Sequence, residues 1–427
     1  MRILLVTPMP PRAEAPGAIP VVLHAQVTGL RRRNEITLVT VVGDEPGELE
    51  ATLELQRSGL DVHWVDRRRP RGVMRWRRRW RLARGWVRGP YPWRTLWFAE
   101  PALQQTVDWL IRTREFDVVA VEDNSMGVFH FPQRLPSVLT EHEVRRPRPI
   151  DWGCGSPSNW PRWAFQEADW RRWPEYQRAI WGRFERIQVF AERDAAAVGE
   201  IAPDLSDRVR VTPFGVDLGD SVRPGREEPG RIVFVGNFTH LPNVDAARWL
   251  VHDIMPLLRS QHDRVQLTLV GGGTSKEIHR LKAEDIDIAG EVPDVAPYLE
   301  SAEVVLAPVR IGGGMRMKVL QALASGKAVV TTSRGAEGLT LGGAEPPFLI
   351  RDDAPGIARA TANLLQDARL REELAARARV LVAKYYSVDA FARRLEKVYD
   401  ELIAEWQGRA GLRQRHEAVR RPRRPIR

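Results

Sequence analysis

The sequence predicts an α/β protein with two consecutive halves, each built of buried strands that alternate with helices. Short apolar runs with the composition of strands alternate with segments of helical periodicity from the first residues onward. The alternation restarts after a charged, turn-rich stretch from Pro224 to Gly230. A length of 427 residues exceeds what one hydrophobic core normally serves, and it suits two domains followed by a tail.

The first half opens with a strand, a helix and a second strand, at Ile3–Val6, Val21–Leu30 and Ile36–Val42. Two later apolar runs, at 116–121 and 137–140, are predicted strands followed at once by Glu122 and Glu141. Ligands gather at the carboxyl ends of the strands in open parallel sheets. Residues 145–180 are rich in proline and tryptophan, and they fit either a lid on the acceptor side or internal packing.

The second half repeats the strand-to-glycine transition. Predicted strands at 232–235, 267–270 and 286–289 each run into a glycine, Gly236, Gly271 and Gly290. The segment from Leu241 opens the next helix, and Asn243 is a candidate for its N-cap.

A glycine loop between two buried strands carries the most information. Val304–Ala307 is a short apolar run, and Gly312 to Gly314 then remove every side chain from the turn, so that backbone N–H groups can approach a ligand. Arg316 and Lys318 open the following helix, whose amino end already carries partial positive charge. A site of this kind suits a diphosphate. Three glycines alone would indicate only an ordinary loop. The neighbouring cations and strands are the features that favour a ligand-binding site.

This region resembles the signature of family 4 glycosyltransferases of the GT-B fold. A subgroup similar to polysaccharide-biosynthesis transferases has the pattern Gly-Gly-Gly-x-Arg-x-Lys-x-Leu-Glu-Ala, which residues 312–322 follow except for Gln321 in place of glutamate. Gly335-Ala336-Glu337-Gly338-Leu339 stands at family spacing, and Pro213-Phe214-Gly215-Val216-Asp217 resembles the family's hinge. The resemblance is dense from about 209 to 400 and weaker from 1 to 145.

The resemblance implies two Rossmann-like domains that face a central cleft. The expected division is an acceptor-side domain at 1–210 and a nucleotide-sugar (donor) domain at 211–385. A C-terminal helix at 386–408 would cross back to the first domain, with Ser387 as its N-cap, and residues 409–427 would form a basic, disordered tail.

The implied activity is retaining, metal-independent transfer of a hexosyl group from a nucleotide sugar to a hydroxyl. The acceptor would be a saccharide, a lipid-linked precursor or a small molecule, in polysaccharide, glycolipid or glycoconjugate biosynthesis, with the nucleotide sugar as co-substrate and no further cofactor. Arg316 and Lys318 would stabilise the leaving diphosphate. His142, in Thr-Glu-His-Glu-Val, matches a family histidine beside the donor sugar, although a structural histidine is the plainer reading without the resemblance.

The remaining donor contacts come from the same motifs. Many relatives place an arginine and a lysine where this chain has Asn237 and Pro242, and we expect Arg316 and Lys318 to replace them. Gln321 occupies the place of a ribose-binding glutamate, and a neutral amide makes a weaker hydrogen bond than a carboxylate. The donor-binding candidates are Gly17, Gly236, Asn237, Gly271, Glu291, Val292, Gly312, Gly313, Gly314, Met315 and Gln321.

Charge is concentrated in one segment. The formal charge is +10, and Arg67 to Arg88 contain eleven arginines and no acidic residue, interleaved with tryptophans. Trp76, Trp80, Ala83 and Val87 recur at the spacing of one helical face. This face either contacts an anionic membrane or packs on the domain core while the arginines are solvated.

Location and rival functions follow from the remaining observations. A single cysteine, Cys154, and the lack of an apolar run of transmembrane length lead us to expect a cytoplasmic protein, free or peripheral on the inner face of the membrane. The rivals are a nucleotide-sugar epimerase with Glu122, Glu141 or Glu337 in the cleft, and a catalytically weak relative that binds nucleotide or tethers an assembly at the membrane. Nucleic-acid binding is disfavoured because it gives the glycine loop no role.

Overall fold

The strands of the first half form one parallel sheet in the order β3-β2-β1-β4-β5-β6-β7. The structure is a computed structural model that describes residues 1–15, 17–67, 73–146, 160–217, 227–313, 315–339 and 345–420. The strands of this sheet are β1 (Arg2–Val6), β2 (Glu35–Val42), β3 (Asp61–Asp66), β4 (Val118–Glu122), β5 (Ser137–Thr140), β6 (Arg186–Val189) and β7 (Val209–Val211).

Helices connect these strands and cover both faces of the sheet. They are α1 (Ala18–Leu30), α2 (Glu48–Arg57), α3 (Val73–Arg88), α4 (Trp93–Phe98), α5 (Pro101–Thr113), η1 (Asn124–Val128), α6 (Trp160–Trp170), α7 (Trp173–Trp181), α8 (Glu192–Ile201) and η3 (Pro203–Arg208). Strands buried on both faces read as continuous apolar runs, which is why Ile3 to Val6 are all fully buried.

The second half repeats this architecture with a parallel sheet in the order β10-β9-β8-β11-β12-β13. Its strands are β8 (Arg231–Val235), β9 (Gln266–Val270), β10 (Ile286–Gly290), β11 (Val304–Ala307), β12 (Ala328–Thr331) and β13 (Leu349–Ile350). Its helices are α9 (Leu241–Trp249), η4 (Leu250–Ile254), α10 (Met255–Arg259), α11 (Lys276–His279), α12 (Ala296–Ser301), α13 (Met317–Ala324), α14 (Ala354–Gln366) and α15 (Ala368–Tyr385).

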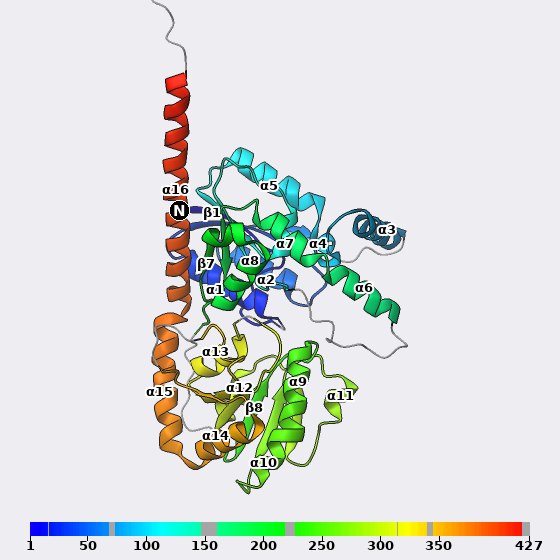
Figure 1. Ribbon diagram of the computed structural model, residues 1–427, viewed down its shortest axis with the longest axis vertical. Helices are drawn as coiled ribbons and strands as arrows, with labels where there is room; N and C mark the ends of the chain where they lie inside the picture. Colours follow the sequence, from blue (N-terminus) through cyan, green and yellow to red (C-terminus); the bar gives the residue numbers. More distant parts are fainter. Residues whose placement is uncertain are drawn as a thin grey trace, which may run out of the picture.

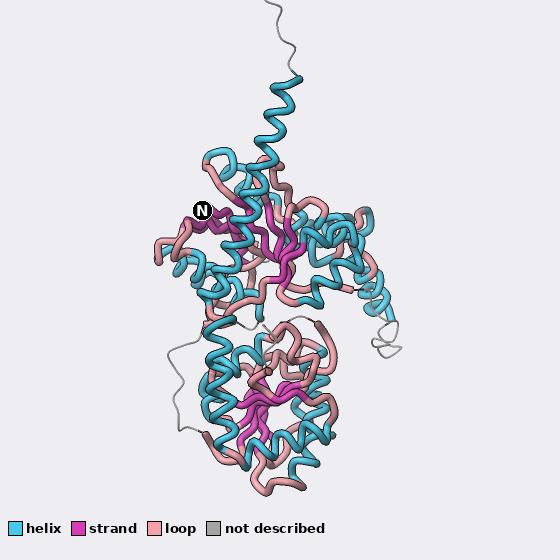
Figure 2. The backbone as a smooth tube through the Cα atoms, turned by 60° about the vertical axis from the view of Figure 1, so that its left-hand side comes forward, coloured by secondary structure: helices cyan, strands magenta, loops and turns pink. Residues whose placement is uncertain are grey.

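The two sheets lie one above the other, each between layers of helices (Figure 2). The predicted α/β class with two Rossmann-like units is therefore confirmed. The sheets divide between β7 and β8, so the predicted boundary at 210 falls within β7, and the exact domain limits stay predictions.

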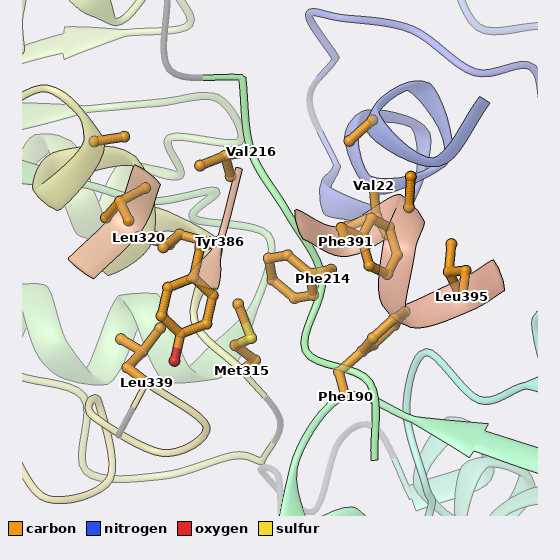
Figure 3. Packing of buried hydrophobic residues seen from close by; sticks show 14 of the residues in the cluster. Val22, Phe190, Phe214, Val216, Met315, Leu320, Leu339, Tyr386, Phe391 and Leu395 are labelled. Carbon is orange, nitrogen blue, oxygen red and sulfur yellow. The ribbon is translucent and has the colours of Figure 1, made fainter. Parts of the chain in front are cut away.

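Two chain crossings hold the halves together at a hinge. The backbone N–H of Val216 donates to the carbonyl of Tyr386 at 2.8 Å, so the outgoing and returning segments run side by side. Gly215 is required there, because a Cβ would lie only 2.7 Å from the carbonyl oxygen of Ser387. Figure 3 shows Tyr386 and Phe214 packed at this junction, with residues of the second half on one side and of the first half on the other.

The last helix, α16 (Val388–Arg420), crosses from the second half back to the first, as predicted. Ser387 caps it, since its hydroxyl accepts a hydrogen bond from the N–H of Ala390 at 3.2 Å. The helix lies along α1 (Figure 1), where a Cβ on Gly29 would come within 2.7 Å of the Cβ of Ala392. It runs past the predicted end at 408, so part of the expected basic tail is helical; residues 421–427 lie outside the described residues.

Candidate active site

The glycine loop and the first turn of α13 present two half-buried cations at the carboxyl end of β11. Gly312 has φ +89, and a Cβ there would lie 3.0 Å from the ring of Pro242, so the residue must be glycine. Arg316 stands at the N-cap position of α13, and its Nε is buried with no hydrogen-bond partner in the described part of the chain. Burial lowers the pKa of Arg316, although nearby Glu337 opposes the shift. A buried donor without a partner indicates a place for an acceptor such as a phosphate oxygen.

Lys318 connects this helix to the turn after β8. Its ammonium donates to the side-chain oxygen of Asn243, whose amide in turn donates to the carbonyl of Asn237 at 2.6 Å. Burial, followed by the charge of Arg316, lowers the pKa of Lys318 to about 7. Lys318 thus reaches the Gly236–Asn237 turn through Asn243, and the replacement of the missing cations stays a prediction.

The predicted N-cap of α9 was wrong. The helix begins at Leu241 with His240 in the cap position, so Asn243 lies in its first turn. The side chain of Asn243 is used instead to hold Lys318 and the Gly236–Asn237 turn, a tertiary contact that local sequence does not reveal.

The turns after β8 and β9 pack backbone against backbone. Gly271 has φ +135, and a Cβ on it would lie 2.1 Å from the carbonyl oxygen of Gly236. A Cβ on Gly236 would in turn lie 3.0 Å from Asn243. Glu291 is exposed and its carboxylate faces Gly272, 3.3 Å from where a Cβ would be, while Val292 packs against the large apolar cluster. The glycines therefore let the ends of β8 and β9 pack directly against each other, and the N–H of Gly271 donates to the carbonyl of Gly290 at the end of β10 at 2.7 Å.

The first half contributes an arginine that the sequence reading missed. Arg193, in the first turn of α8, donates to the carbonyl of Gly312 at 2.8 Å and pairs with Glu337 at 2.9 Å. Its guanidinium also covers Gly313, where a Cβ would lie 2.9 Å from Nη1. Glu337 is held from the other side by Arg334 at 3.0 Å. Arg193 matches no motif, and only its position just past β6 could have indicated a role.

His142 lies at the carboxyl end of β5, facing the junction of the halves. Its Nε2 is 3.1 Å from the buried carboxylate of Glu122, and its ring stands edge-on to Phe190 of the hinge cluster at 5.1 Å. Glu122 also accepts hydrogen bonds from Gln26 at 2.7 Å and Thr140 at 3.0 Å. This carboxylate fixes the orientation of the histidine, which suits a positioning role.

Two more carboxylates line the same edge of the first sheet. Asp123 is the one non-glycine residue with positive φ among the described residues, at φ 72, and its carboxylate lies 3.4 Å from Arg94. Glu141 is buried, and desolvation raises its pKa to about 8 despite hydrogen bonds from Trp181 and Asn124. Strained backbone at a strand end is typical of functional positions.

Several predicted residues are not brought into this cluster. Gly17 caps α1, and the nearest atom to a Cβ there is 3.9 Å away, so its glycine character has no steric cause. Met315 is buried against Gly338 and Tyr386 at the hinge, as Figure 3 shows, and supports the loop from behind. Gln321 is half-buried on α13, and Gly314 lies outside the described residues. The described residues contain no group of three or more histidine, cysteine or carboxylate side chains suited to a metal ion.

The geometry agrees with comparisons to known proteins. Residues 229–367 match the family of glycosyl transferases group 1. The matched residues lie within the second half. The resemblance to family 4 enzymes of the GT-B fold is thus confirmed, and the matched residues contain the glycine loop, Arg316, Lys318 and Glu337.

One relative and several solved structures are similar to this chain beyond the residues that match the family. A phosphatidyl-myo-inositol mannosyltransferase of Mycolicibacterium smegmatis is 28% identical over 218 residues, which are 49% of this chain and 55% of that protein. The chain therefore matches only about half the length of this relative. HepE of Anabaena, solved with UDP and glucose, has a TM-score of 0.62 at 15% identity, covering 94% of this chain and 100% of the other. A sucrose-phosphate synthase of Thermosynechococcus elongatus has a TM-score of 0.65 at 16% identity, covering 95% and 100%.

Proposed function

We propose that this protein is a retaining glycosyltransferase that moves a hexosyl group from a nucleotide sugar to a hydroxyl acceptor. The observation that carries the proposal is the joint placement of Arg316 and Lys318 beside the glycine loop and the Gly236–Asn237 turn. The family match to glycosyl transferases group 1 supports it.

The cation pair and the loop backbone would stabilise the leaving diphosphate. Negative charge develops on the β-phosphate as the glycosidic bond breaks, and fixed cations and N–H donors in a low-dielectric site lower the energy of that state. The Nε of Arg316 is buried and has no hydrogen-bond partner among the described residues. The ammonium of Lys318 lies beside Asn243, near the turn that follows β8. Gly312 and Gly313 let the guanidinium of Arg193 pack against the loop from the side of the first half, which adds a third cation near the leaving group.

His142 would position the sugar. Glu122 orients the imidazole, and Phe190 supports its ring from the hinge side. The acceptor hydroxyl must approach the face from which the leaving group departs, because retention by front-side attack needs both on one side of the sugar. The carboxylates of Glu122, Asp123 and Glu141 are buried and paired within the first half, so they would support this side of the site from behind without contacting the acceptor.

The names of similar proteins guide the choice of substrates. HepE is described in complex with UDP, UDP-glucose and glucose, which makes UDP-sugars the first donors to try. The mannosyltransferase relative acts on phosphatidyl-myo-inositol, which favours glycolipid acceptors among the classes considered. No helix in the described part of the chain is long and apolar enough to cross a membrane, so a lipid acceptor would have to be reached from the surface.

A second candidate is a GT-B protein that binds nucleotide without efficient turnover. The observation that favours it is Gln321, whose side chain makes no hydrogen bond to the described residues and lacks the charge of the family glutamate. The two candidates share the donor site and differ only in turnover.

Nucleotide binding and turnover should be measured on the same purified protein. Thermal-shift titrations with UDP, GDP, ADP and dTDP sugars should show stabilisation by one base, about 2.7 kcal/mol at 100 times the Kd. Arg316→Ala should abolish this shift, whereas Arg280→Ala, at an exposed cation of the same half, should retain it. Release of the nucleotide diphosphate with a lipid-linked or saccharide acceptor then separates the transferase from the non-catalytic candidate. The absence of a shift with every nucleotide would refute both.

A further inference from the structure

The helix α3 is attached to the first half along one side only. Leu82 is buried, and the indole N–H of Trp86 donates to Asp169 at 2.7 Å. Gly85 faces Leu96, with a Cβ position 3.4 Å from its methyl groups. These contacts use the side of the helix that Leu82, Gly85 and Trp86 share.

The far side of α3 carries large apolar side chains in water. Trp76, Trp80 and Val87 are 64%, 71% and 72% exposed. At about 100° per residue they fall within roughly 40° of one another and roughly 80–180° from Leu82, Gly85 and Trp86 on the attached side. The tryptophan stripe therefore does not pack on the domain core, which was one of the two readings of the sequence. Exposed tryptophans in a row are a sign of an interaction surface.

Arginines flank this stripe. The exposed ones are Arg77, Arg79, Arg81, Arg84 and Arg88, and the sequence from Arg67 to Arg88 contains no acidic residue. Figure 1 shows α3 at the side of the first half that lies away from α16, free of the second half. A convex helix with an apolar ridge and cationic flanks is complementary to a flat, apolar and anionic surface.

We propose that this outer face of α3 docks the protein on an anionic lipid bilayer, with the indoles at the level of the headgroups. Tryptophan is favoured at that level because its ring is apolar while its N–H stays hydrated. Arginine stems extend along the apolar surface and hold their charge among lipid phosphates. The helix is too short and too charged to span the membrane, so it lies in the interface plane.

A nucleic-acid strand fits this face less well. Binding of single strands uses a groove that follows the backbone, with aromatic rings spaced along it. Here the tryptophans stand on a convex ridge, and Val87 continues the ridge with a side chain that cannot stack on a base. The docking surface is independent of the transferase proposal, since α3 contributes no residue to the donor site.

Flotation with lipid vesicles tests the proposal on the full chain. Vesicles with about 30 mol% phosphatidylglycerol should bind the protein at least ~10-fold more tightly than phosphatidylcholine alone, and about 0.5 M salt should weaken the binding. Trp76→Ser with Trp80→Ser should reduce partitioning at least ~10-fold. Arg77→Gln with Arg84→Gln should reduce it about fivefold per charge and flatten its salt dependence.

Matched variants keep the result specific to α3. Trp109→Ser removes another exposed tryptophan, on α5, and Arg359→Gln with Arg369→Gln removes two exposed charges from the second half. These should float like the parent protein, and all variants should retain the parent circular dichroism and melting temperature. If the Trp76/Trp80 variant floats normally, another surface such as the basic C-terminal segment binds lipid and the proposal fails. It also fails if the full chain does not bind anionic vesicles. It fails likewise if the chain binds single-stranded RNA more tightly than vesicles, or self-associates, and the same variants lose that property instead of vesicle binding.

Discussion

The carboxyl ends of the strands in the first sheet carry carboxylates and a histidine, whereas those in the second sheet carry glycines and cations. Glu122, Glu141 and His142 follow β4 and β5. Gly312 and the Arg316/Lys318 pair follow β11. Both sheets are parallel and place their loops at one edge, so topology alone does not distinguish the two edges.

The difference in chemistry indicates which substrate each edge receives. Glycines let backbone N–H groups approach an anion, and cations neutralise its charge, so the second edge suits a diphosphate. The carboxylates of the first edge are buried and hydrogen-bonded by neighbouring side chains, so we expect this edge to hold the sugar through His142, which Glu122 orients. Burial favours the neutral form on both edges: it raises the pKa of Glu141 to about 8 and lowers that of Lys318 to about 7.

Removing a cation from the second edge should have the largest effect. We expect Arg316→Ala to reduce transfer by ~10²–10³-fold, as loss of a preorganised donor does in comparable oxyanion sites. Steady-state kinetics would measure it as the change in kcat/KM for the donor. Arg280→Ala is the matched control, and a change below threefold for Arg316→Ala, on the order of what a peripheral charge gives, would contradict the assignment.

Removing the histidine from the first edge should slow turnover without weakening nucleotide binding. We expect His142→Asn to lower kcat by roughly 10²-fold, because a misplaced sugar loses its reactive geometry. The Kd for the nucleotide diphosphate should stay unchanged in calorimetry. An equal loss of nucleotide affinity would show that the two edges do not divide the substrate in this way.

Substitution of glycine by alanine should destabilise the tightly packed turn at Gly271 and leave the open position Gly17 nearly unaffected. Gly271→Ala would force a Cβ against the Gly236 carbonyl at φ +135, which we expect to cost about 1–3 kcal/mol of unfolding free energy. Gly17→Ala has no neighbour within 3.9 Å and should change stability by less than about 0.5 kcal/mol. Denaturant titrations of both variants give the comparison, and similar losses at the two sites would reject it.

The lowered pKa of Lys318 predicts a pH-dependent nucleotide affinity. A bound diphosphate favours the charged ammonium, so binding above about pH 7 must take up a proton. The association constant should fall as pH rises from 7 toward 9, by up to about tenfold per unit. Calorimetry in two buffers of different ionisation enthalpy would detect the proton. Lys318→Arg stays charged and should flatten the profile; an unchanged slope in that variant would assign the proton elsewhere.

Restoring the family carboxylate should give the smallest effect. Gln321→Glu exchanges a neutral acceptor for a charged one, and charge-assisted hydrogen bonds are roughly twice as strong. We expect about fivefold tighter binding of a ribonucleotide diphosphate and little change for its 2′-deoxy analogue, measured by competition. Weaker binding in the variant would mean that Gln321 does not face the ribose.

The sequence predicted the fold better than it predicted the contacts between residues far apart in the chain. Strand ends, the glycine loop and the cap at Ser387 follow from local pattern, and the structure has them. Arg193 and the Lys318–Asn243 contact join residues more than 70 positions apart, and no local rule indicates them. The orientation of the α3 stripe was likewise open, because helical periodicity defines a face but not the direction it points.

The crossing of α16 has a consequence for biosynthesis. Leu395, Tyr399 and Leu402 belong to the same buried cluster as Ile3 and Leu5 of β1. Domains usually fold as units while the chain emerges from the ribosome, amino-terminal first. Here the core of the half that is translated first includes side chains at 395–402, so that core can be completed only after both halves have been translated.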